Sequence, residues 1–239
     1  MRLVIGHLYP DLLNIYGDRG NLLTLLQRAR WRGFDAQIVA IGPDEPLDPE
    51  ACDLYFIGGG QDCQQIRVSE DLRAHKADAL REAVALGAVI LAICGGYQLL
   101  GHYYRPHQGP ELPGISLIDA HTIAGDKRMI GNVSIRRPDG STVAGFENHS
   151  GQTFLGPGVS PLGTVIRGGG NNGRDKTEGV AVGGIYGTYL HGSLLPKNPA
   201  LADELIFKAL KRRYGPLTLS SLPDTLENDA HQRALALRP

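Results

Sequence analysis

One cysteine of this sequence stands where a nucleophile could be presented to a substrate. Cys94 follows an aliphatic run at residues 89–93 and precedes Gly95, Gly96 and a stretch compatible with a helix. That order predicts a buried strand turning sharply into a helix, with the thiol at the turn. The positive end of the following helix favours a thiolate over a thiol, which makes the cysteine more nucleophilic. The same pattern also fits a buried structural cysteine.

A nucleophilic cysteine needs a general base. His191 is the preferred candidate, because it follows an apolar segment at residues 184–190 that predicts another strand. Two residues that end parallel strands of one sheet lie at the same sheet edge, so His191 and Cys94 are expected to meet. The other histidines, which we expect to be solvated or structural, are His7, His75, His102, His107, His121, His149 and His231.

The reaction also needs donors for the oxyanion that forms when the nucleophile attacks. An apolar segment at residues 53–57 runs into Gly58, Gly59 and Gly60, which predicts exposed backbone N–H groups at the same sheet edge. We expect the N–H of Gly59 or Gly60, together with that of Gly95, to form an oxyanion hole. A tight turn that needs positive φ angles is the alternative reason for three glycines.

The elements that must position these residues alternate along the first hundred positions. Strands are predicted at residues 3–8, 36–41, 53–57 and 89–93, and helices at 21–31, with Asn21 as N-cap, and at about 70–86. This alternation predicts an α/β fold with a doubly wound, mostly parallel sheet and flanking helices, whose site lies at the carboxyl ends of the strands.

The second half of the chain has a different pattern. Residues 106–184 are rich in Gly, Pro, Asn and Ser, with short alternating segments at 132–135 and 143–146 that predict added antiparallel strands. An amphipathic helix is predicted at residues 199–213. We therefore expect one domain over residues 1–215 and a C-terminal extension over 216–239, either a terminal helix or a frayed end.

Composition excludes several other classes. The formal net charge is −1, which gives no general attraction to nucleic acid or to an anionic membrane. The three cysteines, Cys52, Cys63 and Cys94, form neither a disulfide framework nor a metal-ligand pattern, so no metal site is expected. No signal-peptide layout or membrane-length apolar run occurs, which favours the cytoplasm. No GxxxxGK[ST] loop or convincing dinucleotide fingerprint occurs, so no cofactor is expected on this chain.

Together, the motifs resemble those of class I glutamine amidotransferases, in the branch that includes cobyric acid synthase. The resemblance rests on residues 58–61 (GGGQ), 94–98 (CGGYQ) and 189–192 (YLHG). Residues 9–22, 146–151 and 190–199 narrow it to glutaminase subunits of lipid II isoglutaminyl synthases, and the likeness covers residues 3 to about 214.

The resemblance implies that Cys94 forms a thioester with glutamine and releases ammonia, with His191 as the base. It places the glutamine carboxylate at Arg128 and implies pocket positions for Gln98 and Gly151. A surface salt bridge is the alternative role of Arg128. The resemblance also implies a heterodimer with a Mur-ligase-like synthetase subunit. That partner would bind ATP and Mg²⁺ and amidate the D-glutamate of the lipid II stem peptide.

Two positions depart from the family pattern. Most class I amidotransferases carry an acidic residue two positions after the histidine, where this chain has Ser193. The carboxylate that orients His191 must then come from elsewhere in the chain or from a partner subunit, or be absent; our hypothesis is that a partner supplies or organises it. Ala92 stands where many relatives carry glycine. The sequence leaves open the roles of three polar residues in the first loop, Asp18, Arg19 and Asn21.

Other functions stay open on the sequence alone. The acceptor of the ammonia is a corrinoid precursor or another small molecule in one alternative, which expects a synthetase domain on the same chain. A stand-alone cysteine hydrolase, acting on peptides or esters, is the second alternative. A catalytically silent binding subunit is the third, and the missing acid after His191 favours it.

Overall fold

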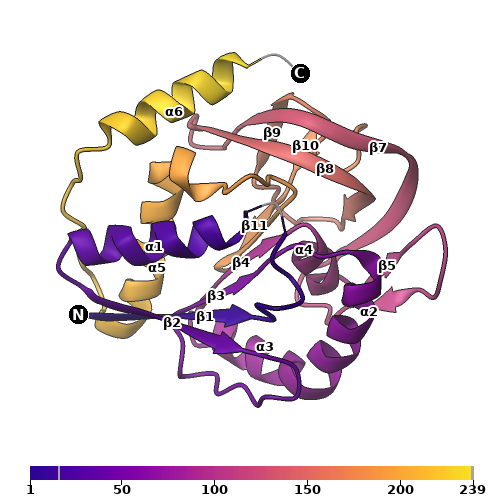
Figure 1. Ribbon diagram of the computed structural model, residues 1–239, viewed down its shortest axis with the longest axis horizontal. Helices are drawn as coiled ribbons and strands as arrows, with labels where there is room; N and C mark the ends of the chain where they lie inside the picture. The colour runs from indigo at the N-terminus through magenta and orange to yellow at the C-terminus, as the bar shows by residue number, and fades with distance from the viewer. Residues whose placement is uncertain (16, 238–239) are drawn as a thin grey trace.

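The computed structural model describes residues 1–15 and 17–237 and has a six-stranded sheet at its centre (Figure 1). Its strand order is β11-β12-β4-β3-β1-β2, and every neighbouring pair is parallel except β11 with β12. The strands are β1 (Arg2–Leu8), β2 (Asp35–Ile41), β3 (Leu54–Ile57), β4 (Val89–Ile93), β11 (Val180–Val182) and β12 (Ile185–Thr188). The predicted doubly wound α/β fold is confirmed.

Helices cover both faces of this sheet (Figure 1). On one face lie α1 (Arg19–Trp31) and α5 (Pro199–Tyr214), and on the other lie α2 (Asp62–Asp71), α3 (Ala77–Ala85) and α4 (Gly95–Leu100). A π-helical turn, Leu72–Lys76, joins α2 to α3. The helix predicted from residue 70 thus begins earlier, at residue 62. Helix α1 likewise begins at Arg19, and Asn21 is not its N-cap: its side chain accepts a hydrogen bond from Leu195 N–H.

The added strands that the sequence predicts, mostly antiparallel, form a second sheet between α4 and β11. Its strands are β5 (Tyr103–Arg105), β6 (Leu112–Pro113), β7 (Ala120–Arg136), β8 (Thr142–Leu155), β9 (Gly163–Arg167) and β10 (Thr177–Glu178). The long antiparallel pair β7–β8 changes register between Ala124 and Met129, so residues 125–128 bulge out of the ladder. This bulge carries Arg128.

The C-terminal extension folds back as a helix, α6 (Thr225–Ala236), within the described residues (Figure 1). Arg28 of α1 is 1% exposed and pairs with Asp203 of α5 at 2.7 Å and with Asp224, just before α6, at 2.6 Å. The guanidinium therefore ties the extension to the main domain. Of the helices in residues 1–15 and 17–237, none is long and apolar enough to cross a bilayer.

The register of the central strands determines where the site lies. Ile57 pairs with Ala92, and Thr188 pairs with Ile93, so β3, β4 and β12 end side by side. All residues of these three strands are buried. The segments that leave them, which begin at Gly58, Cys94 and Tyr189, consequently converge at one sheet edge.

Candidate active site at the carboxyl edge of the sheet

Cys94 occupies the sharp turn that the sequence predicts. Its φ is 50° and its ψ is −106°, a conformation that a side-chain-bearing residue adopts only under strain. Its N–H donates to Thr188 C=O at 2.9 Å, and its own C=O accepts from Gln98 N–H at 2.9 Å. These bonds hold the turn between β4 and α4, so that the thiol stands at the N-terminus of the helix.

His191 reaches the same place from the end of β12. The imidazole is 1% exposed, and the backbone of His191 exchanges two hydrogen bonds with Phe146 of β8, at 2.7 and 3.3 Å. A Cβ atom built on Gly59 would lie 3.1 Å from His191 Cε1 and 3.4 Å from Cys94 Cβ. The structure therefore brings the predicted nucleophile and the predicted base together around Gly59.

An acidic residue that the sequence left without a role stands behind the imidazole. Asp18 is 0% exposed, and its Oδ1 lies 3.6 Å from His191 Nδ1. Burial alone lowers the pKa of His191, but the neighbouring Cys94 side chain and the carboxylate of Asp18 outweigh it and raise this pKa to about 10. An imidazole with this pKa is protonated at neutral pH.

The oxyanion-hole prediction needs one correction. The N–H of Gly59 donates to Asp18 Oδ2 at 2.8 Å, so it is already engaged within the protein. The N–H of Gly60 lies close to the helix turn, because a Cβ on Gly95 would be 3.3 Å from the Gly60 nitrogen. Of the three glycines predicted to supply the oxyanion donors, Gly60 and Gly95 therefore remain the candidates.

The glycine run is explained by space rather than by backbone angles. A Cβ on Gly58 would lie 2.1 Å from the carbonyl oxygen of Leu13, and one on Gly60 would lie 2.4 Å from Leu13 Cδ2. Neither glycine has a positive φ, so the alternative explanation of the run, a tight turn that needs positive φ angles, is wrong. Hydrogen bonds hold the run in place: Gly96 N–H donates to Gly58 C=O, and Gln65 Nε2 donates to Gly60 C=O.

Gly59→Ala is expected to lower kcat for glutamine hydrolysis by roughly 10- to 10²-fold with little change in KM. The added methyl would press on His191 Cε1 and on Cys94 Cβ, and sub-ångström misplacement of reacting groups is costly. Gly42→Ala is the matched control, because a Cβ there meets only Glu45 at ordinary contact distance. Steady-state kinetics test this, and equal kcat values for both variants would contradict it.

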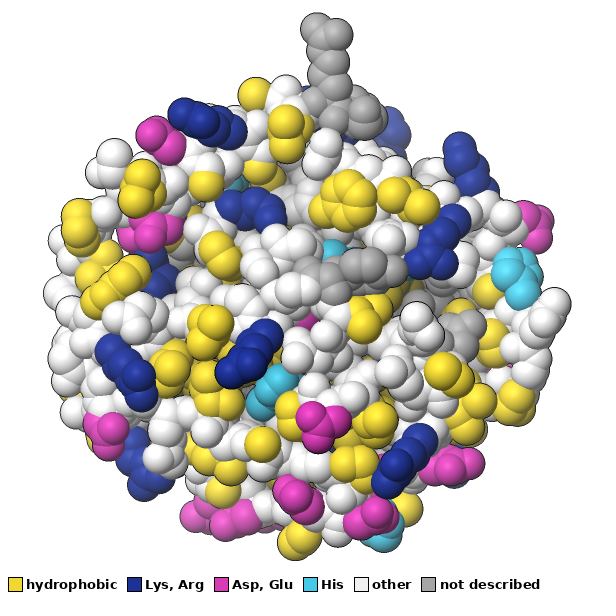
Figure 2. Space-filling model, viewed as in Figure 1, with side chains coloured by type: hydrophobic (Ala, Val, Ile, Leu, Met, Phe, Trp, Pro, Cys, Tyr) yellow, Lys and Arg dark blue, Asp and Glu magenta, His cyan; other side chains and the backbone are white. Residues whose placement is uncertain are grey.

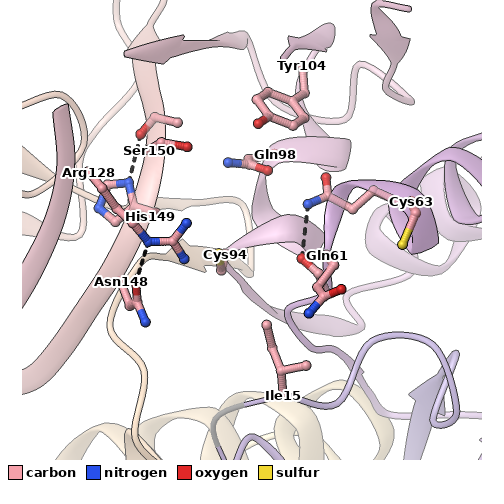
Figure 3. Close-up of a pocket in the computed structure, with 13 residues that line it drawn as sticks. Ile15, Gln61, Cys63, Cys94, Gln98, Tyr104, Arg128, Asn148, His149 and Ser150 are labelled. Carbon is pink, nitrogen blue, oxygen red and sulfur yellow. Dashed lines mark hydrogen bonds between the residues drawn. The ribbon is translucent and has the colours of Figure 1, made fainter. Parts of the chain in front are cut away.

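The site opens into a cavity of about 420 Å³ that contains Cys94 (Figure 3). The bulge of β7 directs Arg128 into it, and Figure 3 shows the guanidinium reaching toward Cys94. Its Nε donates to Asn148 Oδ1 at 2.7 Å, which orients the planar group. The salt-bridge alternative has no support among the described residues, because the side-chain contact found for Arg128 is the one to neutral Asn148.

Gln98 lines the opposite wall of the cavity (Figure 3). Its Nε2 donates to the hydroxyl of Tyr189 at 3.1 Å, while its Oε1 has no protein hydrogen-bond partner among the described residues. Gly151 also lines the cavity, and a Cβ there would lie 2.3 Å from Gln98 Nε2. His149, not expected at a site, lines the cavity and stacks on Tyr189 with ring centroids 3.6 Å apart.

A second buried carboxyl group supports the strand that leads to His191. Glu178 is 0% exposed and accepts hydrogen bonds from Tyr189 N–H at 2.7 Å and from the Thr188 hydroxyl at 3.0 Å. Burial raises the pKa of this carboxyl from 4.5 to about 7, although these two donors oppose the rise. The folded chain therefore binds more protons than the unfolded chain between these values.

Stability is consequently expected to fall as pH rises from about 4.5 through 7, because a raised carboxyl pKa penalises the folded state once the group ionises. Glu178→Gln should remove this fall, which we expect to be on the order of 1–3 kcal/mol. Urea unfolding at pH 5 to 8 tests this, with Glu50→Gln, at an exposed position, as the control. Parallel stability curves for the wild type and Glu178→Gln would contradict it.

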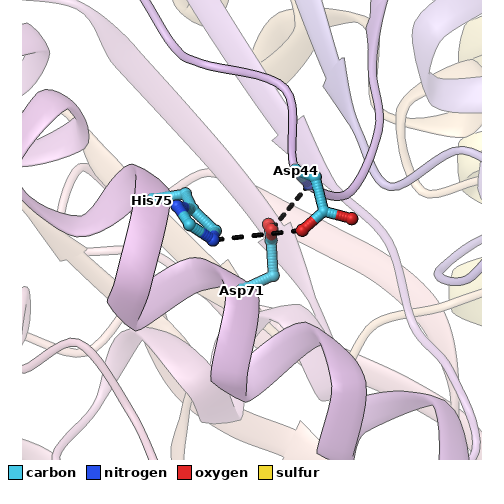
Figure 4. A group of neighbouring side chains, drawn as sticks. All are labelled: Asp44, Asp71 and His75. Atoms are coloured by element: carbon cyan, nitrogen blue, oxygen red, sulfur yellow. Dashed lines mark hydrogen bonds and ion pairs between the residues drawn. The ribbon is translucent and has the colours of Figure 1, made fainter.

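One cluster of metal-ligating side chain types lies away from this cavity, among the residues that the structure describes (Figure 4). It contains Asp44, Asp71 and His75. Asp71 already pairs with the buried ammonium of Lys76 and accepts the Tyr9 hydroxyl at 2.6 Å. Its charge is therefore satisfied within the protein.

On the face that Figure 2 shows, charges of both signs are interspersed with apolar side chains, in keeping with the net charge of −1.

The chain belongs to the CobB/CobQ-like glutamine amidotransferase family, whose sequence model matches residues 4–199. It is thus an enzyme of the glutamine amidotransferase class. The chain is 40% identical to the GatD subunit of lipid II isoglutaminyl synthase (glutamine-hydrolyzing) from Staphylococcus aureus, over 97% of this chain and 93% of that protein. It is 38% identical to the subunit of the same name from Streptococcus pneumoniae, over 95% of this chain and 88% of that protein.

Solved structures agree with this fold. PurLQS from Thermotoga maritima includes a chain that superposes with a TM-score of 0.59 at 17% identity, covering 89% of this chain and 97% of that one. The glutaminase domain of Trypanosoma brucei CTPS superposes with a TM-score of 0.52 at 13% identity, covering 92% of this chain and 98% of that one. At these identities the likeness concerns the fold alone.

Proposed function

We propose that this chain is the glutaminase subunit of a two-subunit amide ligase that acts on lipid II. The observation that carries the glutaminase part is the convergence of Cys94 and His191 around Gly59, at the mouth of a cavity holding an oriented guanidinium. The two GatD relatives, similar over nearly the full length, favour the lipid II acceptor.

In the proposed reaction, the Cys94 thiolate attacks the side-chain amide carbon of glutamine. The electron pair of the carbonyl moves onto oxygen, where the N–H groups of Gly60 and Gly95 stabilise it. The imidazolium of His191 then gives its proton to the amide nitrogen, and ammonia leaves as the thioester forms. Arg128 holds the α-carboxylate, and Gln98 Oε1 accepts an N–H of the substrate.

The second half of the reaction uses the same groups in reverse. Neutral His191 takes a proton from water, and the resulting hydroxide attacks the thioester carbon. A second oxyanion forms at the same donors and collapses with departure of the Cys94 thiolate. The product is glutamate, and His191 is again an imidazolium, so the cycle closes without a net change in the enzyme.

The released ammonia needs an activated acceptor. We propose that a Mur-ligase-like synthetase subunit, MurT, binds ATP and Mg²⁺, phosphorylates the D-glutamate α-carboxylate of the stem peptide, and receives ammonia from this chain in the cytoplasm. The cobyric acid synthase of Pelotomaculum thermopropionicum, 40% identical over 48% of this chain and 25% of that protein, keeps the corrinoid acceptor as the second candidate.

The test is glutamate release from glutamine by the purified chain, alone and co-purified with the synthetase subunit. Lipid II, ATP and Mg²⁺ are then added to the complex, and amidated lipid II is measured by mass spectrometry. We expect glutamate in the first assay and amidated product in the second. The absence of glutamate from both preparations would reject the glutaminase, whereas glutamate without amidated lipid II would reject only the acceptor.

A further inference from the structure

Asp18, in the loop that follows β1, places its buried carboxylate next to both His191 and the glycine run. Asp18 Oδ1 lies 3.6 Å from His191 Nδ1, and Asp18 Oδ2 accepts the Gly59 N–H at 2.8 Å. Asp18 and His191 are at most 1% exposed, so water does not screen the attraction between their charges. One carboxylate thereby links the base to the glycine run that supplies the oxyanion donor.

Ser193 joins this loop to the segment that follows His191. Its hydroxyl donates to the carbonyl of Gly17, the residue before Asp18, at 2.6 Å. The fit is close, because a Cβ on Gly20 would lie 2.2 Å from Ser193 Oγ. Ser193 itself has a φ of 48°, which turns its side chain against the loop at the expense of backbone strain.

A second contact strengthens this connection. The side chain of Asn21, in the first turn of α1, accepts the Leu195 N–H at 2.8 Å, and both residues are buried. Hydrogen bonds from Ser193 and Leu195 therefore flank the position of Asp18 on both sides. The segment after His191 and the loop that carries Asp18 form one hydrogen-bonded unit.

We propose that Asp18 is the positioning residue that orients His191 and the oxyanion loop, and that Ser193 holds Asp18 in place. In this arrangement Asp18, in the first loop, supplies the acidic group, and Ser193, two positions after His191, anchors that loop. The inference rests on the proposed glutaminase function and is an alternative to the hypothesis that a partner subunit supplies the third member.

The substitution Asp18→Asn removes the negative charge of the side chain and keeps its size and shape. The amide oxygen can still accept the Gly59 N–H, but the charge that stabilises the imidazolium is lost. The balance between a thiolate–imidazolium pair and a neutral thiol–imidazole pair then shifts toward the neutral pair. A one-unit fall in the pKa of His191 is a tenfold change in this balance. Asp18→Ala loses the Gly59 contact as well, so it should be the more damaging substitution.

The primary test is the rate at which iodoacetamide alkylates Cys94, measured from pH 5 to 10 by mass spectrometry of the Cys94 peptide. This measurement needs no glutamine turnover, so it stays informative if the proposed function is wrong. We expect Asp18→Asn to slow alkylation at pH 7 by about 10-fold and to narrow the pH range of fast labelling. Asp11→Asn, at an exposed position in the same loop, should behave as the wild type.

Steady-state kinetics on the chain, alone and in complex with its synthetase, provide the second readout. Asp18→Asn should lower kcat by roughly 10²-fold or more with KM changed far less, and its alkaline limb should move to lower pH. Ser193→Ala should lower kcat by about 3- to 10-fold, because the loop loses one hydrogen bond.

Two results would overturn the proposal. One is an alkylation profile of Asp18→Asn that coincides with that of the wild type. The other is a fall in kcat that the complex with the synthetase restores fully, since the partner would then supply the orienting group. A wild type that releases no glutamate, yet shows the expected alkylation shift, would reject the proposed function and leave the positioning role of Asp18 standing.

Discussion

Replacing Cys94 with serine is expected to lower glutamine hydrolysis by roughly 10⁴-fold or more, because the reaction loses its nucleophile. A serine hydroxyl is scarcely ionised at neutral pH, and the imidazolium of His191 cannot deprotonate it. The residues that follow Cys94 in the strained turn, Gly95 and Gly96, have no side chain that could take its place. Glutamate release in a coupled assay measures the effect.

Covalent labelling makes the test specific to the residue. A chloroketone analogue of glutamine should attach to Cys94 of the wild type and increase the protein mass by that of one bound inhibitor group. It should not modify Cys94→Ser. Cys63→Ser is the matched control, because this second thiol also lines the cavity but is exposed on α2, away from the strand-to-helix turn. It should leave activity within about twofold of the wild type and keep the label on Cys94. Labelling that persists in Cys94→Ser would show that another residue is the nucleophile.

The second large effect is expected at Arg128. Arg128→Met should raise the KM for glutamine by about 10²-fold with a smaller change in kcat, because two charge-assisted hydrogen bonds to the α-carboxylate are lost. Arg128→Lys keeps the charge but not the planar fork, so its KM should rise about tenfold. Arg105→Met, at an exposed arginine paired with Glu111, is the control.

A truncated substrate isolates the contact. 4-Aminobutanamide has the side-chain amide of glutamine but lacks the α-carboxylate, so the wild type and Arg128→Met should hydrolyse it with similar, low kcat/KM. If the effect of Arg128→Met disappears when the substrate lacks the carboxylate, the lost binding energy belongs to the contact between Arg128 and the carboxylate and not to a disturbed pocket. If Arg128→Met impaired both substrates equally, Arg128 would not bind the carboxylate.

The central fold was predictable because its signals are local. Short apolar runs such as 89–93 and 54–57, bounded by turn residues and alternating with helical segments, are typical of parallel strands buried on both faces. The start of α2 was missed because its first turns are polar, and the buried Gln65 and Ser69 face hydrogen-bond acceptors instead of the core. Apolar periodicity does not report helices of that kind.

The long strands of the second sheet were predicted only in fragments. Residues 132–135 and 143–146 alternate as strands do, but β7 and β8 continue far beyond them and pass through the bulge at residues 125–128. A bulge interrupts the two-residue period on which the prediction depends. The same bulge directs Arg128 into the cavity. The irregularity that kept the strand from being predicted in full therefore also positions this side chain.

The sequence by itself predicted that Cys94 and His191 meet at one sheet edge, and the structure confirms that they do. The sequence could do so because a residue that directly follows a parallel strand lies at the carboxyl edge of the sheet. Only the tertiary structure placed Asp18 against His191 and Ser193 against Gly17, since these contacts join loops far apart in the chain. It also showed that the Gly59 N–H donates to Asp18, so Gly60 and Gly95 are the donors that we propose for the oxyanion. Contacts between distant loops depend on how the packed elements orient them, and no local pattern records that orientation.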